Sequence, residues 1–593
     1  MTNSKEQYKW KLEDIYATDE LWEQDYQKVQ QLLNEMVGYK GKLDQSSGTL
    51  LEALKCSDNI QMLNEKVFTY AGMRQDEDNN NSTYQALKDR AVNLSTKVHT
   101  ATSFIVPEIL AMPVEKLQQF RQEQPELNSI YGFMLDDLIR EKPHVLSEAE
   151  EQILAQTSEI SQAPNKIFGL LNNADLSFPS IKNEKGEDVA VTHGSYANLM
   201  LNRDRRVRQD AFKSLYSAYD SHKNTIAATL SSSVKRDIFY AQVRKHPSAL
   251  EAALFSDNVQ PQVYDNLIQT VRKNLHLMHR YVALRKKLLA VDELHMYDIY
   301  TPLVKDLDWQ VPYPEAISIV QKGLAPLGQS YLEIMNEGFT SGWIDVYEQK
   351  GKTSGAYSWG PYGVHPYILL NYQDDLNNVF TLAHEMGHAV HSYYSYQEQP
   401  YVNAHYSIFT AEVASTVNET LLMNYMLENT TDKSKKLYLV NHYLEQIRGT
   451  LFRQVMFAEF EKIIHEKAEK GEALTAELFS QVYHQLNVDY YGPEMVIDPE
   501  IDLEWARIPH FYNAFYVYKY ATGISAATSL SKQIVVEGEP AVQRYIAFLK
   551  SGGSDYPVEL LKRAGVDMTS AQPIQDTLDL FASLLDEMEK LTQ

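Results

Sequence analysis

Apolar residues recur three and four positions apart along most of the chain, with charged residues between them. Residues 21–43 and 83–104 show this pattern clearly. On an α-helix the spacing gathers the apolar side chains on one face, which can pack against a core. Only 25 glycines and 21 prolines interrupt the pattern in 593 residues. The sequence therefore predicts a mainly α fold.

The helical pattern breaks at two places. Residues 176–192 contain two short β-like runs on either side of a polar turn with Gly186, which indicates a hairpin. Residues 350–372 are rich in glycine and aromatic residues, and segments 356–359 and 367–372 within them are typical of short strands. Another helical segment follows directly. We therefore predict a small β-sheet beside that helix.

The hairpin also indicates how the chain is divided. We place a boundary near residues 193–196, so that residues 1–195 form an N-terminal helical lobe that ends in the hairpin. Residues 196–593 then form a second, larger domain. With 44% hydrophobic residues the chain can bury a sizeable core, which disfavours global disorder.

Charge and cysteine content narrow the class of protein. The 55 Lys and Arg residues against 79 Asp and Glu residues give a formal net charge of −24, which repels phosphate backbones and anionic lipid headgroups. We therefore expect neither nucleic acid nor a membrane as a partner.

Cys56 is the one cysteine, so no intrachain disulfide can form. The N-terminus has no apolar signal segment, and no uncharged apolar run approaches the ~18 residues of a membrane span, so we expect a cytoplasmic protein.

Two motifs resemble binding sites but predict none. Gly351-Lys352-Thr353 ends like a phosphate-binding loop, but Val346 stands where that loop needs a glycine. A group of four arginines lies in a periodic helix that also carries acidic residues, and we interpret it as a solvated helix face. These are Arg203, Arg205, Arg206 and Arg208.

The strongest chemical signal is an H-E-x-x-H sequence within a helical segment, with His384, Glu385 and His388. On a helix the two histidines lie one turn apart on one face, close enough to share a metal ion. Glu385 falls on the adjacent edge, where it can reach a metal-bound water without binding the metal. Neutral imidazole suits Zn²⁺, which in catalytic sites has three protein ligands and a water. The alternative is a pair of core histidines on a structural helix, which the intervening glutamate disfavours.

A third ligand must come from elsewhere in the chain. Tyr394 occupies the position at which metzincins place their third histidine, so that class is excluded. His391 is a further turn along the helix and points away from a tetrahedral site. A glutamate from residues 409–426 remains, where Glu412 and Glu419 lie on one flank of a second helix. Either could bind the metal while the other orients a histidine.

An aromatic run near the C-terminus, residues 507–520, offers hydrogen-bond donors for a developing oxyanion. Dense aromatic runs are more often core, and composition alone does not assign this one.

Four blocks together resemble a known family, the oligoendopeptidase F branch of the thimet-oligopeptidase-like zinc metallopeptidases. They are FTLAHEMGHAVHSYYS, FTAEVASTVNE, HPYILLNY and WARIPHFYNAFYVYKYATG, and their order and spacing match over the whole chain. The resemblance implies a large helical zinc-peptidase fold with a deep substrate channel and a small β-sheet beside the active-site helix. It also makes residues 196–593 the catalytic domain.

The resemblance implies a role for each acidic residue of the second helix. Glu412, which follows His388 by 412 − 388 = 24 positions, is the third zinc ligand. Glu419 becomes a supporting carboxylate behind the ligands. One Zn²⁺ per chain is implied. Asn378 stands where we expect many relatives to carry an acid, which affects one supporting contact and leaves the ligands intact.

The late block and the predicted strands would bind substrate. The resemblance assigns His510, Tyr512 and Tyr518 to the substrate carbonyl and the tetrahedral intermediate, with Tyr516 as a competitor for one of these roles. It also makes the strand at residues 367–372 an edge on which an extended peptide adds as an antiparallel strand. The implied substrate-binding residues there are Gly355, Tyr357, Leu369 and Asn371.

Together these features predict a zinc-dependent endopeptidase that hydrolyses internal bonds of short oligopeptides. Glu385 would act as general base and a zinc-bound water as nucleophile. One alternative is a non-catalytic zinc scaffold, which does not require Glu385. Another is an exopeptidase, for which Arg507 could anchor the substrate terminus; a structural pairing of Arg507 is favoured.

Overall fold

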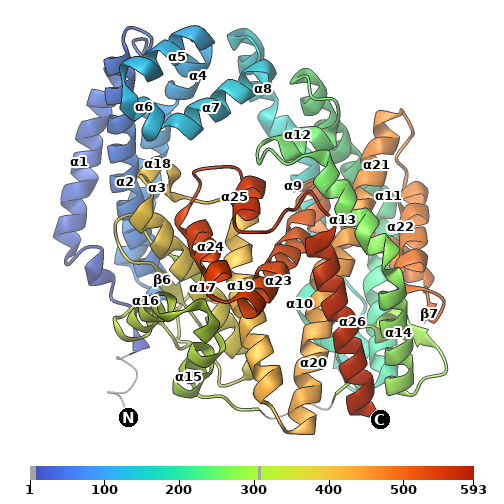
Figure 1. Cartoon of the computed structure of the whole chain (residues 1–593). Coiled ribbons are helices and arrows are strands. Elements are labelled where there is room, and N and C mark those ends of the chain that lie inside the picture. Colours follow the sequence, from blue (N-terminus) through green and yellow to red (C-terminus); the bar gives the residue numbers. More distant parts are fainter. Residues whose placement is uncertain (1–7, 305–308) are drawn as a thin grey trace. The chain divides into compact units, whose positions relative to one another are not determined.

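The computed structural model describes residues 8–304 and 309–593, and most of these residues are helical (Figure 1). The mainly α fold predicted from the pattern is therefore confirmed. The chain divides into two compact units, each built from three separate segments. Unit 1 comprises Met1–Pro143, Asp308–Tyr425 and Leu530–Val566; unit 2 comprises His144–Leu307, Met426–Ser529 and Asp567–Gln593. The division near residue 195 stays a prediction.

Unit 1 begins with three long helices that pack side by side (Figure 1). Trp22 is fully buried among them, and its indole N–H donates to the Val67 carbonyl at 2.8 Å. The helices of this unit are α1 (Asp19–Val37), α2 (Ser47–Glu77), α3 (Ser82–Thr102), α4 (Ile105–Ala111), α5 (Val114–Glu123), α6 (Pro125–Ser129), α7 (Gly132–Glu141), α15 (Tyr313–Gly323), α16 (Gln329–Thr340), α17 (Leu376–Glu398), α18 (Tyr401–Ala404), α24 (Glu539–Lys550) and α25 (Pro557–Arg563).

Unit 2 is organised around α11 (Arg205–Val243), a helix of 39 residues that packs against several others. Its other helices are α8 (Glu148–Ser161), α9 (Ala163–Leu170), α10 (His193–Met200), α12 (Ala249–Phe255), α13 (Pro261–Lys273), α14 (Leu275–Leu289), α20 (Lys433–Ile447), α21 (Arg453–Glu469), α22 (Ala476–Tyr491) and α26 (Gln572–Thr592). Two helices, α19 (Ile408–Asn429) and α23 (Tyr518–Glu537), contribute residues to both units.

The sheets are small, as the two breaks in the helical pattern predicted. The hairpin pairs β1 (Ile181–Lys182) with β2 (Asp188–Val189), and Gly186 adopts φ 81° in its turn. In unit 1, β4 (Ile344–Asp345), β5 (Tyr357–Trp359) and β6 (Tyr367–Leu369) form a sheet in the order β4-β6-β5, and both β5 and β6 contact α17. In unit 2, β3 (Leu294–His295) pairs in parallel with β7 (Met495–Val496).

The arginine cluster at the start of α11 corrects one interpretation. Arg208 is 3% exposed and donates to the fully buried carboxylate of Asp298 at 2.6 Å, and Arg205 pairs with the same carboxylate at 2.8 Å. A buried carboxylate requires such partners, because an unpaired charge in the interior is costly. Arg206 does lie on the surface, paired with Asp210. Arg208 therefore belongs to the core, and the interpretation of a solvated face is wrong for this residue. Arg205 reaches the same carboxylate with a side chain that is 39% exposed.

Among the described residues, no helix combines the length and the apolar character that crossing a bilayer requires.

Candidate metal centre and active site

Helix α17 carries the H-E-x-x-H sequence, and its start is well defined. The Asp375 side chain caps the helix by accepting from the Asn378 N–H at 2.9 Å. Asn378 thus lies in the first turn, where its amide also donates to Asp375. Val379, Met386 and Val390 are fully buried, which fixes the rotation of the helix and the direction of its histidines.

Gly387 lets α17 approach α19 closely. A Cβ at this position would lie 2.7 Å from the Ser415 Cα and 3.0 Å from the Ala414 carbonyl oxygen. No side chain fits there, because real Cβ atoms do not come that close to backbone. The contact brings the first turns of α19 beside the two histidines. Gly387 was not predicted from the sequence as a contact residue, although a glycine inside a helix is itself a sign of close approach.

Three potential metal ligands converge between these two helices. The His384 and His388 Nε2 atoms are 3.1 Å apart, and the His384 Nε2 lies 3.7 Å from a Glu412 oxygen. Ligand atoms of the three residues all lie within 4.8 Å of one another. Within the described ranges this is the only such group of His, Cys, Asp or Glu residues. His391 is outside it, buried and stacked on Tyr406 with ring centroids 3.6 Å apart.

The chemistry of these donors fits a cation. The His384 Nδ1 contacts a Glu419 oxygen at 2.5 Å, which directs the Nε2 of the same ring toward His388 and Glu412. Burial lowers the pKa of His384, but the hydrogen bond to Glu419 and the negative charges of Glu419, Glu385 and Glu412 together outweigh burial and raise it to about 9. Burial and the charge on His384 lower the pKa of His388 to about 3, which keeps it neutral. Two imidazole nitrogens and a carboxylate oxygen facing one point are the donor set of a His₂Glu zinc site.

Glu385 lies beside this cluster and also touches the sheet. Its side chain is 7% exposed, and burial together with the charges of Glu412 and Glu419 raises its pKa to about 7. The backbone of Ser358 in β5 lies near its carboxylate and partly offsets this rise in pKa. A carboxyl group that titrates near neutral pH is suited to accept and return a proton.

The sheet order corrects the expected position of the peptide-binding edge. We expected residues 367–372 to form that edge, but β6 lies between β4 and β5 and its backbone is paired on both sides. The free edge beside Glu385 belongs to β5. Strand β4 has only two residues, too few to leave a recognisable pattern.

The expected substrate-binding residues occupy this part of unit 1. Tyr357 lies in β5 opposite the buried Leu369, and its hydroxyl donates to Asp76 at 2.7 Å. The Asn371 amide donates to the Gly355 carbonyl at 2.8 Å, next to the start of the edge strand. Gly355 adopts φ 88° in open space. Their roles toward substrate stay predictions.

The late aromatic block lies in unit 2, and its residues differ sharply in exposure. Tyr512 is 4% exposed, with its hydroxyl 2.6 Å from that of Thr229 and its ring stacked on Phe168. Tyr518 is 1% exposed and packs against Tyr264. Both tyrosines therefore sit in the core of this unit.

Three rings of the same block are only partly buried and lie close together. The His510 and Tyr516 rings are nearly parallel with centroids 6.2 Å apart, and Tyr520 meets both edge-on. Burial lowers the pKa of His510, so its imidazole is neutral at pH 7. Tyr520 was not singled out from the sequence, because nothing but its place in an aromatic run distinguishes it.

Comparison with known families defines the class of protein. The family model of Peptidase family M3 matches residues 198–580, and a model named Oligopeptidase F matches residues 108–178. The chain therefore belongs to peptidase family M3 and is a metalloendopeptidase.

Individual relatives match over almost the whole chain. Oligopeptidase PepF of Bacillus subtilis is 53% identical over 98% of this chain and 87% of its own length. Group B oligopeptidase PepB of Streptococcus agalactiae is 42% identical over 99% of this chain and 97% of its own. The crystal structure of oligoendopeptidase-F from Enterococcus faecium is 40% identical, with a TM-score of 0.74 over 97% of this chain and 99% of that one.

Proposed function

We propose that this metalloendopeptidase is zinc-dependent and cleaves internal bonds of short oligopeptides, with Glu385 as its general base. The single observation that carries the proposal is the convergence of His384, His388 and Glu412 beside Glu385. The relatives named oligopeptidases support oligopeptides as substrates.

His384, His388 and Glu412 would hold the zinc ion, and Glu419 would keep the His384 ring in its ligating orientation. When bound, zinc supplies Lewis-acid chemistry, polarising the scissile carbonyl and lowering the pKa of water. Glu385 takes the proton from the attacking water and returns it to the departing amine. The Ser358 backbone near its carboxylate belongs to the strand on which we propose that the peptide lies.

We further propose that His510 and Tyr516 donate hydrogen bonds to the developing oxyanion. They are the partly exposed members of the predicted set, whereas the hydroxyl of Tyr512 is already paired and Tyr518 is deeply buried. The earlier assignment of Tyr512 and Tyr518 stays a prediction, and their burial favours a supporting role.

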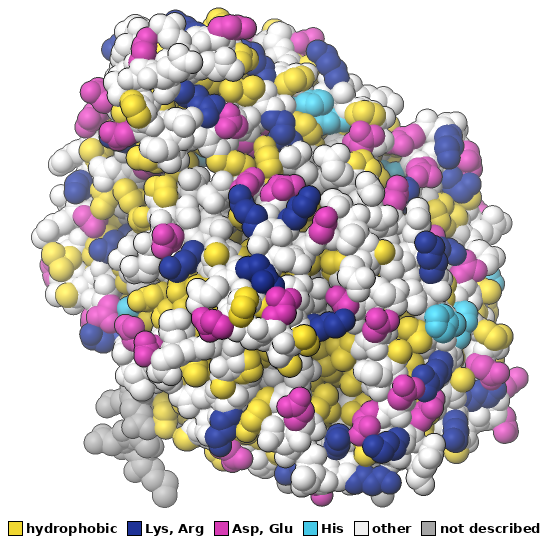
Figure 2. Space-filling view, viewed as in Figure 1, with side chains coloured by type: hydrophobic (Ala, Val, Ile, Leu, Met, Phe, Trp, Pro, Cys, Tyr) yellow, Lys and Arg dark blue, Asp and Glu magenta, His cyan; other side chains and the backbone are white. Residues whose placement is uncertain are grey.

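An exopeptidase is less well supported. Arg507, the basic anchor it would need, pairs with Glu504 at 3.4 Å and lies over the ring of Tyr196. Lys, Arg, Asp and Glu side chains are interspersed over the face drawn in Figure 2, which gives no support to a nucleic-acid partner. We also propose a cytoplasmic location, because a single cysteine suits a reducing compartment.

The test replaces Glu385 with Gln and measures both zinc content and cleavage of a quenched fluorescent peptide blocked at both ends. We expect one zinc per chain and an unchanged thermal midpoint, with turnover reduced by at least about 10³-fold. Glu398→Gln, at an exposed glutamate of the same helix, is the matched control and should keep wild-type turnover. Undiminished turnover in Glu385→Gln would refute the mechanism, and failure of the wild type to cut the blocked peptide would exclude endopeptidase action.

A further inference from the structure

The chain between Tyr512 and Tyr518 adopts an unusual conformation. Phe515 has φ 59°, in the left-handed region that bulky side chains rarely occupy. Such a conformation persists only where the surroundings impose it. The next residue is Tyr516, whose ring is aligned with His510, so the turn at Phe515 affects where the Tyr516 side chain lies relative to His510.

Two hydrogen bonds from neighbouring helices hold this turn. The Phe515 N–H donates to a Glu461 oxygen of α21 at 3.1 Å, and Arg236 of α11 donates to the Tyr512 carbonyl at 3.2 Å. The Phe515 ring packs on His465, one turn after Glu461, with centroids 4.5 Å apart. The turn is thus fixed at both of its ends.

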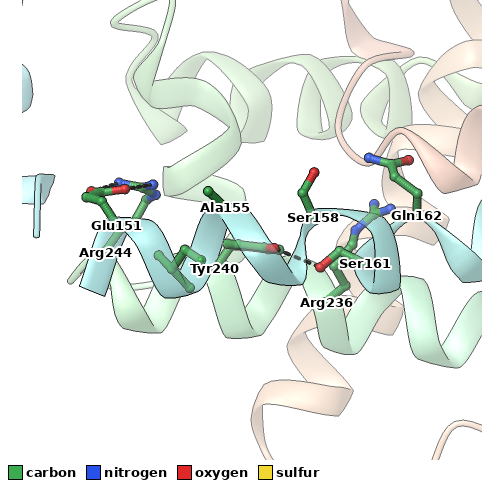
Figure 3. Close-up of a pocket in the computed structure, with 9 residues that line it drawn as sticks. Glu151, Ala155, Ser158, Ser161, Gln162, Arg236, Tyr240 and Arg244 are labelled. Carbon is green, nitrogen blue, oxygen red and sulfur yellow. Dashed lines mark hydrogen bonds and ion pairs between the residues drawn. The ribbon is translucent and has the colours of Figure 1, made fainter. Parts of the chain in front are cut away.

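Packing alone does not fix the turn, because cavities border it. Residues 513–515 line a cavity of about 300 Å³ together with Arg236. Arg236 also lines a second cavity of about 470 Å³, in which Tyr240 bonds to Ser161 and Arg244 pairs with Glu151 (Figure 3). The Phe515 ring itself is buried and packed, but residues 513–514 before it border open space, so the two hydrogen bonds restrain this part of the turn.

Burying the Glu461 carboxyl group in the core is energetically unfavourable. The residue is 1% exposed, and its second oxygen has no hydrogen-bond partner among the described residues. Burial, with the nearby charge of Asp237, raises the pKa of its carboxyl well above the usual range, because the charged form is poorly solvated there. An apolar residue would fill the site at lower cost, which indicates that the bond to the Phe515 N–H is the feature this glutamate provides.

We propose that Glu461 and Arg236 are positioning residues of this peptidase, which hold the turn at Phe515 and thereby place Tyr516 beside His510. The inference rests on the proposed function, in which those two side chains contact the reacting carbonyl. Glu461 and Arg236 touch neither substrate nor metal in this account. They act through the backbone of the turn.

The test compares kcat, KM, zinc content and thermal midpoint for Glu461→Met and Glu461→Gln. Met has a similar size but cannot accept the hydrogen bond, so we expect kcat to fall about 10- to 100-fold, the range for a catalytic group displaced by about 1 Å. KM should change less than about 3-fold and zinc content not at all, because the turn acts on the transition state. Gln has a similar shape and keeps an acceptor oxygen, so it should keep kcat within about 3-fold of the wild type.

Glu459→Gln is the matched control, since Glu459 lies on the same helix but pairs with Arg272 and Tyr490. A folded Glu461→Met with wild-type kcat, or an equal loss of kcat in Glu459→Gln, would overturn the inference. If Glu461→Met does not fold, Arg236→Met removes the other hydrogen bond to the turn, the one to the Tyr512 carbonyl. We expect the same fall in kcat with little change in KM. A folded Arg236→Met with wild-type kcat would overturn the inference. Glu385→Gln is assayed in parallel: wild-type turnover there refutes the proposed function, whereas its inactivity beside a fully active Glu461→Met refutes only the positioning role.

Discussion

The contact between α17 and α19 predicts the effect of a single methyl group. In Gly387→Ala the new Cβ would lie 2.7 Å from the Ser415 Cα and 3.0 Å from the Ala414 oxygen, where ordinary contacts begin near 3.4 Å. The helices must separate by roughly 0.5–1 Å, because both clashing atoms belong to backbone. Overpacking of this kind destabilises a protein by about 1–3 kcal/mol.

The same displacement moves Glu412 away from the histidines. We therefore expect zinc affinity to fall about 10- to 100-fold, as it does when the supports of metal ligands are removed. Competition with a fluorescent zinc chelator measures the affinity, and calorimetry measures the thermal midpoint. Gly169→Ala is the control, since Gly169 is also helical but a Cβ there meets no atom within 4 Å. Wild-type zinc affinity and thermal midpoint in Gly387→Ala would refute the reasoning.

Three further predictions concern separate parts of the molecule. Glu419→Ala should weaken zinc binding about 10- to 100-fold by freeing the His384 ring, and chelator titration showing wild-type affinity would contradict this. Tyr516→Phe should lower kcat about 10²-fold, whereas Tyr512→Phe should mainly lower the free energy of unfolding, by about 1 kcal/mol; steady-state kinetics and urea denaturation distinguish them. Burial raises the pKa of Asp58 to about 6 from 3.8, so the folded state loses stability through this group as pH rises from about 4 to 6. Asp58→Asn should remove that loss and stabilise the protein by about 2 kcal/mol more at pH 7 than at pH 4.5, whereas a pH-independent difference in urea denaturation would contradict the shift.

Local patterns were sufficient to predict the elements that carry the site. The 3.6-residue spacing around His384 and the apolar flank of Glu412 predicted two helices, and both are present as α17 and α19. The polar turn with Gly186 predicted the first hairpin for the same reason, because turn residues and alternation act within a few positions of the chain.

Features that depend on distant contacts were not predictable in this way. The order β4-β6-β5 depends on a two-residue strand, and the burial of Arg208 depends on Asp298, which lies 90 positions away in the sequence. The separation of partly exposed Tyr516 from buried Tyr512 and Tyr518 likewise depends on neighbours from other helices. Residue type and spacing do not encode these contacts directly.

Anomalous diffraction at the zinc edge, from crystals of the zinc-loaded protein, would identify the side chains that bind the metal. We predict one peak per chain, at about 2.0–2.2 Å from the His384 and His388 Nε2 atoms and a Glu412 oxygen. A zinc peak away from these three side chains, in a preparation that cleaves the blocked peptide, would contradict the assignment of the active site.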